Sequence, residues 1–292
     1  MRAEEANVHR FLTTFIAGAL LFATAQVSVA EPAALASAWT GENHTRARLI
    51  AGGPAVDSPR GTIAVGVEIE LADGWKTYWR NPGSSGVPPQ IDWAASSNLA
   101  SAELRYPAPT RYTEREGDII GYKKRLIFPV AVRPADPTRD VKLVLAIEYG
   151  VCKDICIPVQ TRLEIALPPG AAEQSMGSQL AKAFDRVPRP RDARRPNDPE
   201  LRKAKIELDG PQPMIRLDVA FPGGAEGADV FVEVPDGMWI PMAKPAGPPQ
   251  GDTASFVVNL ADGADVSSLK GKSVRVTLVS PRGQSEASLK LD

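Results

Sequence analysis

The only two cysteines of the chain, Cys152 and Cys156, are four positions apart. In an extended strand, residues at this spacing lie about 13 Å apart, whereas a disulfide requires Cα atoms within about 7 Å. The flanking residues include Val151, Ile155 and Ile157, which favour strands over a helix. We therefore expect a tight hairpin in which residues 153–155 form the loop and the two cysteines face each other across its base.

A disulfide that closes so short a loop restrains the unfolded chain little, since the loop-closure entropy grows with loop length. A bond at a hairpin tip is also open to in-line attack by a thiolate. This placement indicates thiol–disulfide exchange, with a purely structural bond as the alternative. Lys153 favours a thiolate at its neighbour Cys152, while Asp154 opposes it. On that basis we expect Cys152 to attack and Cys156 to resolve.

Other chemistries have less support in the sequence. A zinc site needs three or four ligands, and outside the N-terminal segment the chain offers only the two cysteines and His44. No haem-attachment motif follows Cys156, and residues 83–86 do not form a nucleophile elbow. Phosphate-cradling glycine loops are also absent from the sequence. We therefore expect no metal and no small-molecule cofactor.

The N-terminal thirty residues have the pattern of a secretory signal peptide. Arg2 and Arg10 provide positive charge, residues 11–25 form an apolar run, and Ser28 and Ala30 are small residues before an expected cleavage site. An uncleaved N-terminal anchor is the alternative. We expect export to the periplasm as a soluble protein.

The charge balance excludes one class of partner. Lys and Arg total 34, Asp and Glu total 35, and the net charge is −1. Such a chain has no net field that would attract nucleic acid. We expect no nucleic-acid partner.

The length and the turn-forming residues predict an all-β protein of two domains. A chain of 292 residues suits about two domains, and 27 Pro with 24 Gly indicate many turns. Alternating or apolar segments predict strands at 62–71, 75–79, 126–132, 141–149, 161–167, 215–221, 228–234, 254–260 and 273–279. Short strands separated by turn residues are typical of antiparallel sandwiches.

A helix and a linker are expected between the two domains. An apolar stripe at helical spacing, stopped by Pro188, comprises Met176, Leu180, Ala183, Phe184 and Val187. The proline- and arginine-rich segment that follows predicts a solvated linker rather than a binding patch. The expected boundaries are 1–30, 31–168, 169–200 and 201–292. The last of these domains has no Cys and no His, and we expect it to be a structural or docking module.

Several motifs together resemble the N-terminal periplasmic domain of the DsbD thiol:disulfide interchange family, in particular its ScsB-like branch. The motifs are WKTYWRNPGSSGVP from Trp75, then IDW from Ile91, YPAP from Tyr106, Gly121-Tyr122, and VCKDICIP from Val151. They extend over residues 75–158. No motif in residues 201–292 contributes to the resemblance.

The resemblance implies an immunoglobulin-like sandwich whose two cysteines shuttle electrons to periplasmic acceptors. Family members of full length also have a membrane-embedded conducting domain and a thioredoxin-like domain, neither of which is in this chain. A separate membrane protein is therefore expected to supply the electrons. The implied partners are thioredoxin-like or disulfide-isomerase-like proteins, including proteins of cytochrome c maturation.

The family also shields its cysteines with an aromatic-bearing cap loop, and chain order assigns this role to residues 112–122. The residues expected to cap or line the site are Tyr78, Trp79, Glu116, Asp118, Tyr122, Lys153 and Asp154. Trp75, Tyr78, Trp79 and Trp93 have an alternative role, since aromatic residues on strands usually form a sandwich core.

The expected function is thiol–disulfide interchange through Cys152 and Cys156, which is a protein-disulfide reductase activity. The alternative is a periplasmic docking module in which the disulfide is structural.

Overall fold

The computed structural model describes residues 35–41, 43–84, 86–115, 117–235 and 237–292. The predicted signal peptide and the predicted site residue Glu116 therefore lie outside the described residues. Within these ranges, no helix is both long enough and apolar enough to span a bilayer.

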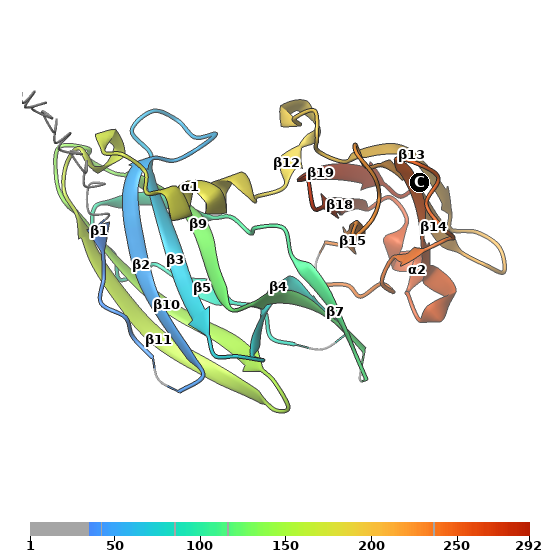
Figure 1. Ribbon diagram of the computed structural model, residues 1–292, viewed down its shortest axis with the longest axis horizontal. Coiled ribbons are helices and arrows are strands. Elements are labelled where there is room, and N and C mark those ends of the chain that lie inside the picture. The colour runs from blue at the N-terminus through green and yellow to red at the C-terminus, as the bar shows by residue number, and fades with distance from the viewer. Residues whose placement is uncertain (1–34, 42, 85, 116, 236) are drawn as a thin grey trace, which may run out of the picture. The chain divides into compact units, whose positions relative to one another are not determined.

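The first half of the chain forms two packed antiparallel sheets (Figure 1). The strand order of one sheet is β1-β2-β3-β9-β6, with bounds Leu35–Ala36, Thr45–Pro54, Ile63–Leu71, Arg125–Pro134 and Leu99–Leu104. The order of the other is β11-β10-β4-β8-β7, with bounds Cys156–Leu167, Val141–Cys152, Lys76–Gly83, Gly117–Lys123 and Thr110–Glu114. The short strand β5, Gln90–Asp92, pairs with β10.

The core of this sandwich lies between the two sheets. Val65, Val67 and Ile69 of β3 point into it, opposite Leu145 and Ile147 of β10. Side chains alternate between the two faces of a strand, so the intervening residues of β3 lie on the face directed away from this core, where another element must bury them. Helix α1, Ser178–Asp185, is that element, because its Leu180 and Phe184 pack against the other face of the sheet.

The predicted helix is present but shorter than its apolar stripe. Leu180, Ala183 and Phe184 are buried as the spacing predicts, whereas Met176 and Val187 lie beyond the helix ends. A residue that precedes proline is disfavoured in the α conformation, which accounts for the early C-terminal end.

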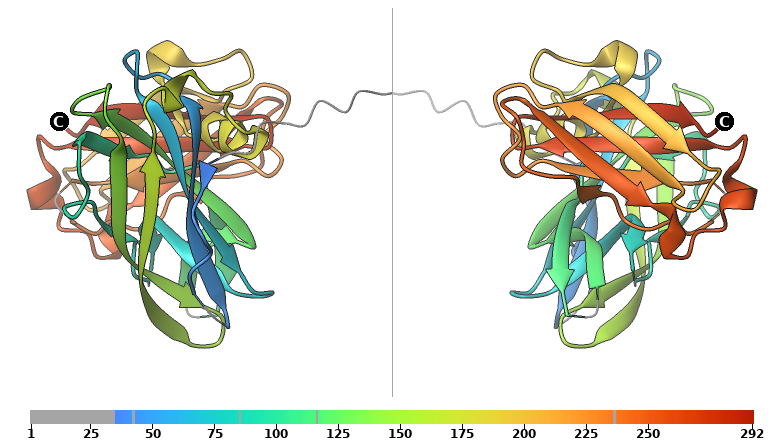
Figure 2. Two further views of the ribbon diagram at one scale, coloured as in Figure 1. Left: turned by 90° about the vertical axis from the view of Figure 1, so that its left-hand side faces the viewer. Right: turned by 90° about the vertical axis from the view of Figure 1, so that its right-hand side faces the viewer.

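The second half of the chain forms another sandwich of two four-stranded sheets. One sheet has the order β12-β19-β18-β15, with bounds Arg189–Pro190, Gly283–Lys290, Ser273–Ser280 and Asp229–Glu233. The other, in orange tones towards the viewer on the right of Figure 2, has the order β13-β14-β17-β16, with bounds Glu200–Glu207, Met214–Ala220, Thr253–Asn259 and Lys244–Pro245. The short helix α2, Val266–Leu269, also belongs to this half. The expected all-β, immunoglobulin-like fold is confirmed.

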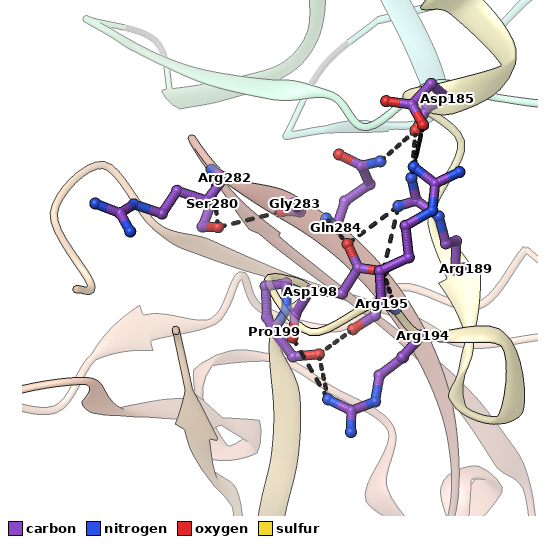
Figure 3. A network of polar contacts seen from close by, with 11 residues as sticks. Asp185, Arg189, Arg194, Arg195, Asp198, Pro199, Ser280, Arg282, Gly283 and Gln284 are labelled. Carbon is purple, nitrogen blue, oxygen red and sulfur yellow. Dashed lines mark hydrogen bonds and ion pairs between the residues drawn. The ribbon is translucent and has the colours of Figure 1, made fainter. Parts of the chain in front are cut away.

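The arginine-rich connection between the sandwiches is held by specific contacts (Figure 3). Arg189 forms an ion pair with Asp198, and their side chains are only 11% and 3% exposed. Asp198 also accepts hydrogen bonds from the backbone amides of Arg195 and Gln284. Arg189 is therefore not the solvated linker residue that composition suggests, because a buried carboxylate from the same segment pairs with it.

Candidate functional site

The predicted cysteine hairpin is confirmed. Strand β10 ends at Cys152, β11 begins at Cys156, and the two residues are directly paired across the ladder. They form a disulfide with Cα atoms 4.2 Å apart. Residues 153–155 make the turn, in which the amide of Lys153 donates to the carbonyl of Ile155 at 3.1 Å.

The two sulfur-bearing residues differ in accessibility. Cys152 is 2% exposed, whereas Cys156 belongs to the exposed class. At the tip of the turn, Ile155 is 65% exposed. A thiolate from another protein can therefore approach Cys156 more readily than Cys152.

The pairing register places the disulfide on the outer face of its sheet. Cys152 lies opposite Cys156 on one side and opposite Lys76 of β4 on the other. Directly paired residues point to the same face of a sheet. The neighbouring residue Val151 belongs to the sandwich core, so this face is the one directed away from the core.

Tyr78 contacts both sulfur atoms from this outer face. Its hydroxyl donates to the Sγ of Cys152 at 2.6 Å and lies 3.3 Å from the Sγ of Cys156. Burial, together with the nearby charge of Glu114, raises the pKa of Tyr78 above its usual value. The hydroxyl therefore remains a hydrogen-bond donor at neutral pH.

Two glycines provide the space for the Tyr78 ring. A Cβ atom added at Gly150 would lie 3.0 Å from the ring, and one added at Gly86 would overlap it. Gly86 also has a φ of +142°, which other residues rarely adopt. The tyrosine is thus held between two segments of backbone.

The β7–β8 hairpin covers the buried sulfur. Tyr112 and Ile119 pack with Tyr78 and Cys152 in a small apolar cluster separate from the main core. Glu114, at the end of β7, forms an ion pair with Lys76, whose side chain is only 5% exposed. Within residues 112–122, the segment expected to form the cap, Tyr112 and Ile119 therefore pack near the disulfide and Glu114 pairs with Lys76.

The predicted lining residues are only partly brought together. Tyr78 lies at the disulfide, and Lys153 and Asp154 lie in the turn beside it, with the Lys153 side chain against Gly74.

Three other predicted residues point elsewhere. Trp79 is fully buried in the core, as is most of Tyr122, whose hydroxyl donates to the Pro107 carbonyl at 2.8 Å. Asp118 binds Arg111 and Thr113 rather than the cysteines.

Sequence analysis did not select Lys76, and it placed Tyr112 and Glu114 only within the expected cap segment 112–122. The alternation of β4 was a signal for Lys76, because it lies two positions before Tyr78 and so shares its face. Among the described residues, no group of three or more His, Cys, Asp or Glu side chains could hold a metal ion.

Comparison with known proteins finds a family match for the first sandwich and a structural match for most of the chain. Residues 46–168 match the family described as "Thiol:disulfide interchange protein DsbD, N-terminal". No curated protein matches the chain. Among solved structures, the N-terminal periplasmic domain of ScsB from Proteus mirabilis aligns with 88% of this chain and 98% of its own, with a TM-score of 0.66 and 19% identity. At this identity the likeness establishes a shared fold that extends over both sandwiches.

Proposed function

We propose that this protein, whose residues 46–168 form a DsbD N-terminal domain, passes electrons between partner proteins by thiol–disulfide exchange at Cys152–Cys156. The proposal includes export to the periplasm, as the N-terminal sequence predicts. The observation that supports it is a disulfide between an exposed cysteine and a buried one, whose sulfur accepts a hydrogen bond from Tyr78.

In the reductive step, a donor thiolate attacks the exposed Sγ of Cys156 in line with the disulfide. The bond between the two sulfurs breaks, and its electron pair leaves with Cys152 as a thiolate. A second thiolate of the donor then attacks the donor sulfur of the resulting mixed disulfide. The donor is released with its own disulfide, and Cys156 is left as a reduced thiolate.

In the delivery step, the thiolate of Cys156 attacks a substrate disulfide and forms a mixed disulfide. Cys152 then attacks the Sγ of Cys156, which restores the intramolecular bond and releases the reduced substrate. This order reverses the one that Lys153 suggests from sequence, because accessibility favours Cys156. Trapping with Cys152→Ser should capture substrate through Cys156, and Cys156→Ser should capture little.

The proposed partners are thioredoxin-like or disulfide-isomerase-like proteins, with a separate membrane protein as the electron donor. Cys156 lies at the exposed end of the β10–β11 hairpin, where a partner cysteine can approach it. No small-molecule cofactor enters either step, since both electrons travel with the sulfur atoms.

The decisive measurement is the reduction potential of Cys152–Cys156, obtained by equilibrating the folded protein in thiol redox buffers. Values of catalytic dithiols span about −120 to −270 mV, and a result in that range is expected. A value well below about −300 mV would indicate a structural bond and favour the docking-module alternative. In that case a Cys152→Ser, Cys156→Ser double variant should retain partner binding.

A further inference from the structure

Lys76 is a buried lysine beside the reactive disulfide. It is 4% exposed, and lysine is seldom so buried unless it is paired. Its partner is Glu114 from the cap hairpin. On the neighbouring strand, the residue directly opposite Lys76 is Cys152, so the two side chains share the outer face of the sheet.

Tyr78 connects this ion pair to the sulfur. Tyr78 lies two positions after Lys76 on the same face of β4, and its hydroxyl donates to the Sγ of Cys152 at 2.6 Å. The charge of Glu114 acts on that same hydroxyl. The Lys76–Glu114 pair therefore lies within electrostatic range of the buried sulfur.

We propose that Lys76, held by Glu114, stabilises the thiolate of Cys152 in both exchange steps. This inference rests on the proposed function and specifies how the buried cysteine takes part. When a donor attacks Cys156, the electron pair of the broken bond goes to the Sγ of Cys152, and the ammonium lowers the cost of that leaving thiolate. When Cys152 resolves a mixed disulfide, the same ammonium maintains the attacking thiolate.

Other charged or titratable groups face the site from each adjacent element. They are Tyr78 on β4, Tyr112 and Glu114 on β7, Lys123 on β8, and Lys153 and Asp154 in the turn. Lys123 lies over the Tyr112 ring, 4.1 Å from its centroid. The side chain of Lys153 lies against Gly74. Lys76 is the only one of the three lysines in the buried class.

The test is a pH titration of the single thiol of Cys152 in a Cys156→Ser background, followed by the ultraviolet absorbance of the thiolate. Lys76→Met retains most of the side-chain length and removes the charge. An opposite charge within a few ångströms shifts a pKa by about one unit or more, so we expect roughly tenfold less thiolate at neutral pH. Lys153→Met is the matched control, because it removes a charge adjacent in sequence, and it should shift the titration less.

Glu114→Gln leaves Lys76 in place and should shift the pKa of the Cys152 thiol in the opposite direction from Lys76→Met. Loss of the carboxylate leaves the ammonium less compensated, so the pKa of the Cys152 thiol should fall. Unchanged titration in Lys76→Met would overturn the inference, as would a larger shift in Lys153→Met than in Lys76→Met. The opposite sign of Glu114→Gln keeps the test valid if Lys76→Met does not fold.

Failure of this inference can be distinguished from failure of the proposed function. The titration uses a variant that cannot form the intramolecular disulfide, so it reports only on the surroundings of Cys152. The reduction potential of the intact pair reports on exchange. A potential in the catalytic range with no effect of Lys76→Met would retain the function and remove the role of Lys76.

Discussion

At the residue scale, the disulfide is defined by the difference between its two sulfurs. Cys156 is exposed, while Cys152 is buried beneath Tyr112 and Ile119 and accepts a hydrogen bond from Tyr78. A hydrogen bond to sulfur becomes stronger when the sulfur gains negative charge. The arrangement therefore assists release of Cys152 as a thiolate more than release of Cys156.

Tyr78→Phe should slow reduction of the disulfide by dithiothreitol. A hydrogen bond to a charged group contributes about 1.5–3 kcal/mol, so loss of the donor should slow reduction roughly tenfold or more. Because burial raises the pKa of Tyr78, its protonated form is favoured and the effect should persist into mildly alkaline solution. The rate of reduction can be measured by alkylating the free thiols at successive times after dithiothreitol is added.

Tyr122→Phe is the control for that substitution. It also removes a buried tyrosine hydroxyl, but this hydroxyl binds the Pro107 carbonyl rather than a sulfur. If both variants slow reduction equally, general loosening of the sandwich accounts for the result and Tyr78 has no special part.

At the element scale, β4 places apolar and polar side chains on opposite faces of its sheet. Trp79 points into the core, while Lys76 and Tyr78 point outward to the disulfide. Thr77 binds β4 to β10, since its hydroxyl donates to the Gly150 carbonyl at 2.8 Å. Strand β4 therefore contributes side chains both to the hydrophobic core and to the surroundings of the disulfide.

Gly86→Ala should displace Tyr78 and destabilise the site. Its Cβ would overlap the tyrosine ring, and overpacking typically costs about 1–3 kcal/mol. Gly210→Ala is the matched control, because Gly210 also has a positive φ, +103°, but no atom lies within 4 Å of an added Cβ. Gly86→Ala should have the lower denaturation midpoint, because only there does the added Cβ overlap another side chain. Equal midpoints would mean that backbone strain alone acts at Gly86.

At the scale of the whole described chain, the two sandwiches are joined by ionic contacts. Arg80, which follows Trp79 on β4, binds Glu233 and Glu286 of the second sandwich, both at distances under 3 Å. Arg111 binds Asp229, and Phe231 packs into the core cluster of the first sandwich. The strands that bear the disulfide's neighbours thus also contact the second sandwich.

Asp198→Ala should destabilise the connection between the sandwiches (Figure 3). Removal of one member of a buried ion pair costs about 3 kcal/mol or more, and Asp198 also accepts from two backbone amides. Asp209→Ala is the comparison, because its pair with Lys270 is exposed and such pairs contribute about 0–1 kcal/mol. The free energy of unfolding in urea measures both. A loss at Asp198 no larger than at Asp209 would contradict the expected role.

The features that depend on neighbours along the chain could be predicted from the sequence alone. The four-residue spacing of Cys152 and Cys156 and the β-forming residues around them specified the hairpin. Alternation predicted strands such as β3 and β10, and helical spacing predicted the buried face of α1. These features are local, because a strand, a turn or a helical stripe is specified within about ten residues.

The side chains that surround the disulfide, and the difference in accessibility between its two cysteines, could be found only from the tertiary structure. Lys76 and Glu114 lie 38 positions apart, and Tyr78 lies 74 positions from Cys152. Their meeting depends on which strands pair and on the register of β4 against β10. Sequence proximity suggested Lys153 as the charge that acts on Cys152, whereas strand pairing places Lys76 there. Burial depends on the packing of distant elements, so the spacing of residues could not show that Cys152 is covered and Cys156 is exposed.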